Sequence, residues 1–200
     1  MNNPANNNEH SETRLAIFAS GTGSNTQKII DYFRNDDNIN ISLIVCNKPG
    51  AGVLQIAEKE NISTLIIERG KFFADGYVTT LQENKIDWVI LAGFLWKVPV
   101  PLIQAFPNRI INIHPALLPK YGGKGMYGHF VHEAVLAAGE KESGITIHYV
   151  DEHFDHGAPI LQVKCPVEAN DTPDSLAQKI HALEHRYYPA TIRDLIAKGI

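Results

Sequence analysis

Two polar side chains, Asn112 and His114, interrupt the otherwise apolar stretch IINIHP. They alternate with Ile111 and Ile113, so in an extended strand both project from the same face. Pro115 follows and keeps His114 out of the helical region, so the chain stays extended beyond the pair. A carboxamide can donate a hydrogen bond and an imidazole can carry a proton. Together the two groups could stabilise an oxyanion and transfer a proton.

A second group of ionisable residues, in and beside the segment YVDEHFDHGAPI, offers candidates for a third member. These residues are His148, Asp151, Glu152, His153, Asp155 and His156. A carboxylate beside His114 would hold the imidazolium form and raise the pKa of that ring. The residue types do not decide which acid does so. They are equally consistent with a solvated acidic turn and a histidine that serves only the core or the surface.

The same histidines raise the question of a metal site. The spacing His148-x4-His153-x2-His156 could ligate zinc. Along a strand end and a turn, however, the three side chains would point in different directions, and the sequence has no His-Glu-x-x-His motif. We therefore predict that the protein holds no metal.

The segment SGTGSN, residues 20–25 and called the glycine loop below, follows a short apolar run and precedes a helical pattern. Gly21 and Gly23 let the backbone approach a ligand closely, and the first amides of the helix can then bind an anion. Ser24 adds a hydroxyl, and Asn25 can cap the helix or bind the ligand. The loop lacks the third glycine of the dinucleotide fingerprint and the lysine of a Walker motif. A single phosphate is the better fit, and a plain helix cap is the alternative.

Hydrophobic periodicity predicts the elements that must position these side chains. Seven strands are expected at residues 15–19, 41–46, 63–67, 87–94, 109–113, 144–150 and 160–167. Helices are expected at residues 26–33, 53–61, 74–84, 99–106, 129–138 and 174–198, the last kinked or broken before Pro189.

This alternation of strands and helices predicts an α/β fold, with a doubly wound, mostly parallel sheet, helices on both faces and a Rossmann-like first half. The strand at 87–94 is the most hydrophobic and is expected at the centre. The last two strands are joined by a short loop and should form an antiparallel hairpin, which makes the sheet mixed.

The composition sets limits on the class of protein. The chain has 200 residues, 44% of them hydrophobic, which suits one domain with a sizeable core. We predict a loose polar tail at residues 1–13 and a single domain at 14–200. The net charge of −4 gives no electrostatic case for a nucleic-acid or membrane partner. Cys46 and Cys165 match no metal or redox spacing and indicate reduced thiols in the cytoplasm.

Five segments carry a resemblance to a known family: LAIFASGTGSNTQ, VILAGFLWKV, RIINIHPALLPKY, GITIHYVDEHFDHGAPILQ and LEHRYYP. In order and position they resemble the folate-dependent formyltransferases. The glycine loop narrows the resemblance to the branch of phosphoribosylglycinamide formyltransferases, enzymes of purine biosynthesis. The similarity covers residues 15–189, nearly the whole chain beyond the tail.

This resemblance implies an enzyme that transfers a formyl group from 10-formyltetrahydrofolate, its co-substrate, to the amine of glycinamide ribonucleotide. By matching position, it implies a catalytic trio of Asn112, His114 and Asp155. The implied ribonucleotide contacts are Gly23, Ser24, Asn25 and Glu184, and the implied folate contacts are Leu95, Trp96, Lys97, Val98 and Asn112. It requires no metal and no covalent enzyme intermediate. The protein would be a monomer or a homodimer.

Some positions depart from the pattern that the resemblance leads us to expect. No arginine for the folate stands in the stretch 73–77, where Lys71 could substitute, and His181 replaces a glutamine of some relatives. Ala116 replaces a serine that is frequent in the family. The loop after Pro119 is longer than in some relatives, although its basic residues, Lys120, Lys124 and His129, would suit an anionic substrate.

Three other functions share parts of this pattern. Formyltetrahydrofolate deformylases have the same Asn, His and Asp core but usually carry a regulatory domain before it. Methionyl-tRNA formyltransferases add a C-terminal domain and a basic surface. A nucleotide-binding module could keep the glycine loop without chemistry, although the intact Asn112, His114 and Asp155 argue against it.

Overall fold

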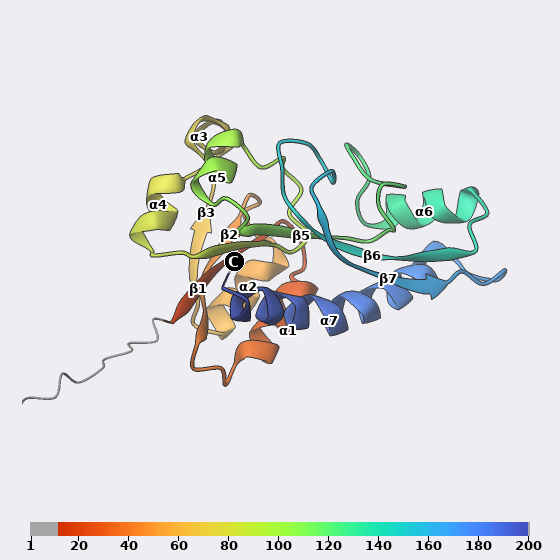
Figure 1. Ribbon diagram of the computed structural model, residues 1–200, viewed down its shortest axis with the longest axis horizontal. Helices are drawn as coiled ribbons and strands as arrows, with labels where there is room; N and C mark the ends of the chain where they lie inside the picture. Colours follow the sequence, from red (N-terminus) through yellow and green to blue (C-terminus); the bar gives the residue numbers. More distant parts are fainter. Residues whose placement is uncertain (1–11, 200) are drawn as a thin grey trace, which may run out of the picture.

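The sheet of the computed structural model, which describes residues 12–199, has seven strands in the order β3-β2-β1-β4-β5-β6-β7 (Figure 1). They are β1 (Thr13–Ala19), β2 (Ile39–Cys46), β3 (Ser63–Ile66), β4 (Trp88–Leu91), β5 (Ile110–His114), β6 (Glu142–Tyr149) and β7 (Pro159–Pro166). All seven expected strands are present, and β4 lies at the centre. The predicted tail lies outside the described residues up to position 11, and its last residue, Thr13, already belongs to β1.

Strand direction divides the sheet into two parts. Strands β1 to β5 pair in parallel, whereas β6 is antiparallel to both β5 and β7. The loop 150–158 joins β6 to β7, and the antiparallel pairing of these two strands confirms the expected late hairpin and the mixed sheet. Because β5 and β6 are antiparallel, Asn112 lies directly opposite His148.

Residues 12–199 form seven helices around this sheet. They are α1 (Ser24–Phe33), α2 (Gly52–Lys59), α3 (Arg69–Asp75), α4 (Val78–Glu83), α5 (Val100–Ala105), α6 (His129–Ala137) and α7 (Pro173–Ala197). Figure 1 shows α1, α2 and α7 on one side of the sheet and α3, α4 and α5 on the other. The predicted doubly wound arrangement is therefore confirmed.

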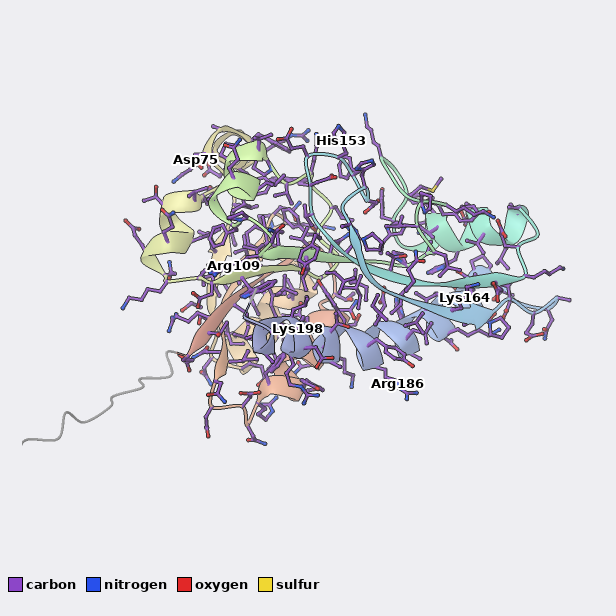
Figure 2. The ribbon with its side chains drawn as sticks, in the orientation of Figure 1. Asp75, Arg109, His153, Lys164, Arg186 and Lys198 are labelled. Atoms are coloured by element: carbon purple, nitrogen blue, oxygen red, sulfur yellow. The ribbon has the colours of Figure 1, made fainter. Side chains whose placement is uncertain are left out.

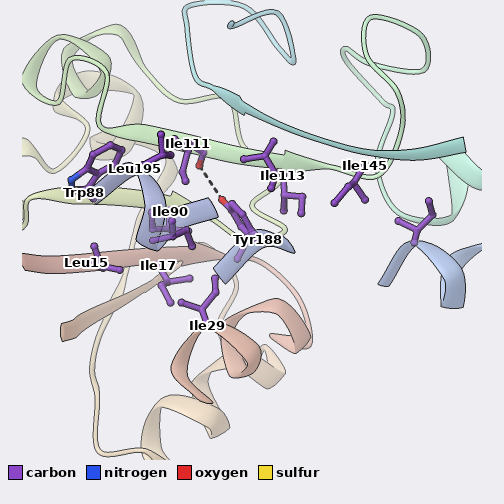
Figure 3. Packing of buried hydrophobic residues seen from close by; sticks show 14 of the residues in the cluster. Leu15, Ile17, Ile29, Trp88, Ile90, Ile111, Ile113, Ile145, Tyr188 and Leu195 are labelled. Carbon is purple, nitrogen blue, oxygen red and sulfur yellow. Dashed lines mark hydrogen bonds between the residues drawn. The ribbon is translucent and has the colours of Figure 1, made fainter. Parts of the chain in front are cut away.

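Alternate residues of the central strands build a core on each face. Ile17 packs with Ile29 of α1 and Tyr188 of α7 in one cluster, which Figure 3 shows from close by. Its neighbour Phe18 belongs to the opposite cluster, together with Phe72 of α3. Full burial of side chains of this size contributes about 1.5–3 kcal/mol each. The apolar strand residues thus hold helices on both faces.

Two helices differ from expectation for identifiable reasons. The predicted helix at 74–84 is replaced by α3 and α4, because Gly76 and Tyr77 adopt left-handed φ angles of 66° and 55° between them. In contrast, α7 continues through Pro189, so of the two expected outcomes, a kink or a break, the break is wrong. Proline removes one backbone donor, but Tyr188 and Ile192 beside it are buried in the core, and this packing keeps the helix on the sheet.

The topology also fixes where a ligand can bind. The strand order reverses between β1 and β4, and in open α/β sheets ligands bind beyond the carboxyl ends of the strands at such a point. The glycine loop, the segment after β4 and the end of β5 all meet there. None of the helices formed by residues 12–199 has the length and apolar character needed to cross a membrane.

Candidate active site

A cavity of about 730 Å³ lies at this edge of the sheet and is called the central cavity below. It brings together most of the residues singled out in the sequence: Gly23, Ser24, Asn25, Leu95, Trp96, Lys97, Asn112, His114, Asp155 and Glu184. Val98 is the exception, because its side chain is buried in the apolar core rather than lining the cavity. We do not retain Val98 as a ligand contact.

The glycine loop delivers the start of α1 to the central cavity. Gly23 has a φ of 84°, which glycine adopts without strain, and it stands immediately before Ser24, the first residue of α1. Within residues 12–199 no side chain caps α1, so the first-turn amides of the helix have no side-chain partner there. Such amides can bind an anion. The alternative prediction, in which Asn25 caps the helix, is wrong.

Asn25 instead contacts the other side of the cavity. Its Nδ2 donates to Oε2 of Glu184 on α7 over 2.9 Å. Glu184 is 6% exposed, and burial raises the pKa of its carboxyl although the Asn25 hydrogen bond acts in the opposite direction. His181, one turn earlier on α7, also lines the cavity. Asn25 and Glu184 therefore form a polar pair beside the glycine loop.

The end of β5 and the loop between β6 and β7 meet as the catalytic hypothesis requires. Oδ2 of Asp155 lies 3.5 Å from Nδ1 of His114, and its Oδ1 lies 3.4 Å from Nδ2 of Asn112. The other ring nitrogen of His114, Nε2, is 2.7 Å from the carbonyl oxygen of Tyr121. Gly123 donates its backbone N–H to Oδ2 of Asp155 over 2.9 Å. Asp155 is thus the acid of the loop that reaches His114.

The charge state of this group differs from expectation. Burial lowers the pKa of His114 below its ordinary value, although the charge of Asp155 and the carbonyl of Tyr121 act in the opposite direction. The prediction that the acid raises the pKa of His114 is confirmed for the effect of Asp155 itself, but the net pKa is lower than usual because burial of the ring outweighs the carboxylate at 3.5 Å.

Asp155 itself is held ionised. Burial opposes ionisation, but His148, the charge of His114 and the Gly123 N–H outweigh it and lower the pKa of Asp155. A protonated His114 could donate to both Tyr121 and Asp155, whereas the neutral ring can donate to only one of them. The ring therefore rests toward the neutral form with a stabilising acid beside it.

The three histidines considered for zinc are not brought together. His148 is 2% exposed and faces Asn112, whereas the side chains of His153 and His156 are more than 70% exposed (Figure 2 shows His153 on the outer loop). His153 and His156 instead lie near Asp151, and the nitrogen and oxygen atoms that these three residues could offer a metal lie within 4.8 Å of one another. The histidine spacing alone could not distinguish a buried strand position from an exposed turn.

Sequence reasoning missed an arginine of the central cavity. Arg69, at the start of α3, lines the cavity, and its guanidinium lies 5.6 Å from the ring centroid of Phe73. Arg69 and Phe73 are four residues apart in α3 and so share one face. The helical spacing could have pointed to Arg69, but the stretch considered began four residues too late. Lys71, the expected substitute, instead lies over the ring of Tyr77 at 4.6 Å.

Of the three basic residues noted in the long loop, only one lines the central cavity. Lys124 lines the central cavity, together with the neighbouring glycines and Tyr127. Lys120 does not, because its ammonium group pairs with Glu140 over 2.8 Å. His129 is likewise not among the residues that line the cavity.

The sequence of this chain is similar to those of known formyltransferases. The formyl transferase family matches residues 13–192. The chain is 44% identical to the chloroplastic phosphoribosylglycinamide formyltransferase of Arabidopsis thaliana, over 88% of this chain and 62% of the relative. It is 35% identical to phosphoribosylglycinamide formyltransferase of Bacillus subtilis, over 92% and 94% of the two chains. The chain thus spans about three fifths of the plant relative and nearly all of the bacterial one.

A solved structure shows the same fold. The crystal structure of phosphoribosylglycinamide formyltransferase from Bacillus halodurans aligns with a TM-score of 0.85 at 36% identity, over 94% of this chain and 97% of the other.

Proposed function

Since this chain belongs to the formyl transferase family, we propose that it transfers a formyl group from 10-formyltetrahydrofolate to the amine of glycinamide ribonucleotide. The products are formylglycinamide ribonucleotide and tetrahydrofolate, and the reaction serves purine biosynthesis. The observation that carries the proposal is the meeting of Asn112, His114 and Asp155 in the central cavity, beside a glycine loop suited to one phosphate.

The ribonucleotide is assigned to the end of the cavity formed by the glycine loop. The amides at Gly23, Ser24 and Asn25 would bind its phosphate, because they start a helix that no side chain caps. Lys124 lines the same cavity and adds a positive charge. Glu184 offers an acceptor that suits the hydroxyl groups of a ribose. These groups together match a sugar phosphate better than a dinucleotide.

The folate is assigned to the end of the cavity lined by the segment after β4. Leu95, Trp96 and Lys97 all line it, and the ring centroid of Trp96 lies 6.0 Å from that of Phe73. Aromatic and apolar surfaces suit a pterin, whose ring stacks on them. Arg69 and Lys97 supply the positive charges that the carboxylates of a folate tail require. The position of Arg69 in the cavity supports this place for the tail.

Proton balance defines the roles of the catalytic residues. The amine loses a proton as it attacks the formyl carbon, and the folate nitrogen gains one as it leaves. His114 rests toward the neutral form and can first accept and then donate that proton. We assign the transfer to Nδ1, because Nε2 is bonded to Tyr121 at 2.7 Å. Asp155 stabilises the imidazolium, and Asn112 donates to the oxygen of the tetrahedral intermediate.

One assay tests this function against its alternatives. The purified chain is mixed with 10-formyltetrahydrofolate, with and without glycinamide ribonucleotide, and the release of tetrahydrofolate is followed. The proposal expects release that depends on the ribonucleotide. Tetrahydrofolate release at the same rate with and without the ribonucleotide would contradict the proposal and favour a deformylase. No release under either condition would favour a binding module.

The setting of the protein is part of the proposal. Both cysteines, Cys46 and Cys165, are free, which supports a reducing compartment such as the cytoplasm. A monomer or a homodimer that needs neither a metal nor a nucleic acid stays a prediction. Light scattering and metal analysis of the active protein would test it.

A further inference from the structure

Asn112, the amide assigned to catalysis, has a buried neighbour, His148, that was considered above only as a group near His114 and as a zinc ligand. His148 on β6 lies directly opposite Asn112 on β5, and its Nε2 is 3.1 Å from Nδ2 of Asn112. The histidine side chain is 2% exposed, so its position is set by packing rather than by solvent. The side chains of Asn112 and His148 therefore form a fixed pair across the neighbouring strands β5 and β6.

The other ring nitrogen of His148 decides what Nε2 can do. Nδ1 lies 2.7 Å from the carbonyl oxygen of Tyr149, and a carbonyl can only accept a hydrogen bond. Nδ1 therefore carries the hydrogen, and in the neutral ring Nε2 is left as an acceptor. An N–H of Asn112 is the donor that it accepts.

This acceptor fixes the orientation of the Asn112 amide. With Nδ2 toward His148, the second N–H of Asn112 points at Oδ1 of Asp155 over 3.4 Å. A flipped amide would place its oxygen against a lone pair of His148 and a carboxylate oxygen of Asp155, and both contacts would be repulsive. Of the two bonds, the longer one to Asp155 is the one that an incoming formyl oxygen can replace.

We propose that His148 is a positioning residue for formyl transfer: its Nε2 holds the Asn112 carboxamide so that the second N–H is presented to the oxygen of the formyl group. The inference rests on the proposed function and deepens it. His148 is not among the residues that line the cavity. Its Nε2 also lies 3.7 Å from Oδ1 of Asp155, farther than the 3.1 Å to Nδ2 of Asn112. It acts through Asn112.

The test measures formyl transfer by the full chain with 10-formyltetrahydrofolate and glycinamide ribonucleotide. His148→Ala should lower kcat about 10- to 100-fold with little change in either KM, since loss of a transition-state donor itself costs about 100- to 1,000-fold. His148→Gln restores an acceptor near the place of Nε2 and should recover most of the loss. His153→Gln, a change of an exposed histidine nearby, should match the wild type.

A double-mutant cycle separates positioning from a direct role. If His148 acts through Asn112, adding His148→Ala to Asn112→Ala should cost little further activity. Independent, multiplicative losses would overturn the proposal, as would wild-type kcat in His148→Ala. Thermal unfolding of each variant checks that it is folded.

A measurement on the unmodified protein keeps the proposal falsifiable if the variants do not fold. Nitrogen NMR of labelled histidine should show His148 with the hydrogen on Nδ1, and a hydrogen on Nε2 in the neutral ring would overturn it. An inactive wild type would count against the proposed function, whereas an active wild type with an indifferent His148 would count against this inference alone.

Discussion

Gly23→Ala should damage the glycine loop far more than the same change two residues earlier. Gly23 has a φ of 84°, and a non-glycine residue there costs about 1–2 kcal/mol. A Cβ at this position would also lie 3.0 Å from Cα of Val53 and 2.8 Å from Cδ1 of Ile56. The tip of Ile56 can move, but the backbone of Val53 belongs to α2, so the loop must shift. We expect a total loss of about 2–3 kcal/mol in the free energy of unfolding.

The matched control is Gly21→Ala. A Cβ at Gly21 has no heavy atom within 4 Å, and Gly21 is not among the glycines with positive φ. Its effect should stay within about 0.5 kcal/mol. For a chain of this size, the Gly23→Ala loss corresponds to a melting temperature lower by about 4–12 °C.

The same substitution should weaken ribonucleotide binding, because the loop shift moves the amides that start α1. Loss of one hydrogen bond to a charged group costs about 1.5–3 kcal/mol, which raises Kd by roughly tenfold or more. Circular dichroism gives the melting temperature, and calorimetric titration with glycinamide ribonucleotide gives the affinity. The reasoning is refuted if Gly23→Ala and Gly21→Ala melt together and bind the ribonucleotide equally well.

Three further predictions use other parts of the molecule. Arg69→Ala should raise the KM for the formylfolate about tenfold or more while leaving ribonucleotide affinity unchanged, because it removes a charged hydrogen-bond donor; steady-state kinetics with an unchanged folate KM would contradict it. Burial lowers the pKa of His132 from 6.5 to about 4. Between pH 6.5 and pH 4 this histidine is therefore protonated in the unfolded chain but neutral in the folded one, so the free energy of unfolding falls as the pH drops through this range. In His132→Leu, urea titrations at about pH 6.5 and pH 4 should show a fall in unfolding free energy that is smaller by about 3 kcal/mol than in the wild type. An unchanged fall would contradict the lowered pKa of His132. Tyr188→Phe should cost about 1–3 kcal/mol of unfolding free energy, because its buried hydroxyl can donate its one hydrogen to the carbonyl oxygen of Leu91 at 2.9 Å or of Ile111 at 3.3 Å (Figure 3 shows the bond to Ile111). Equal stability would refute this.

The fold could be predicted largely from hydrophobic periodicity. Continuous apolar runs such as the one in β4 report burial on both faces of a sheet, and that burial is what the structure has. The errors lie where tertiary packing overrides local preference. Pro189 stays inside α7 because its neighbours are buried, and no local signal reports that burial.

The grouping of the candidate site could also be anticipated, because strand alternation places Asn112 and His114 on one face. The charge state of His114 could not be predicted from the sequence. The pKa of His114 depends on how far the ring is dehydrated relative to its distance from Asp155, and both quantities exist only in the folded chain. The contact of His148 with Asn112 was not anticipated for a similar reason, since it depends on the register between β5 and β6.

Whether Asp155 sustains the proton transfer is tested most directly by the turnover of Asp155→Asn. The change keeps the shape of the side chain and removes the charge beside His114, so kcat for formyl transfer should fall at least about 100-fold with ribonucleotide affinity nearly unchanged. Asp151→Asn, which alters an acid of the same loop that pairs with His156, is the matched control and should keep normal turnover. Near-normal kcat in Asp155→Asn would contradict the account.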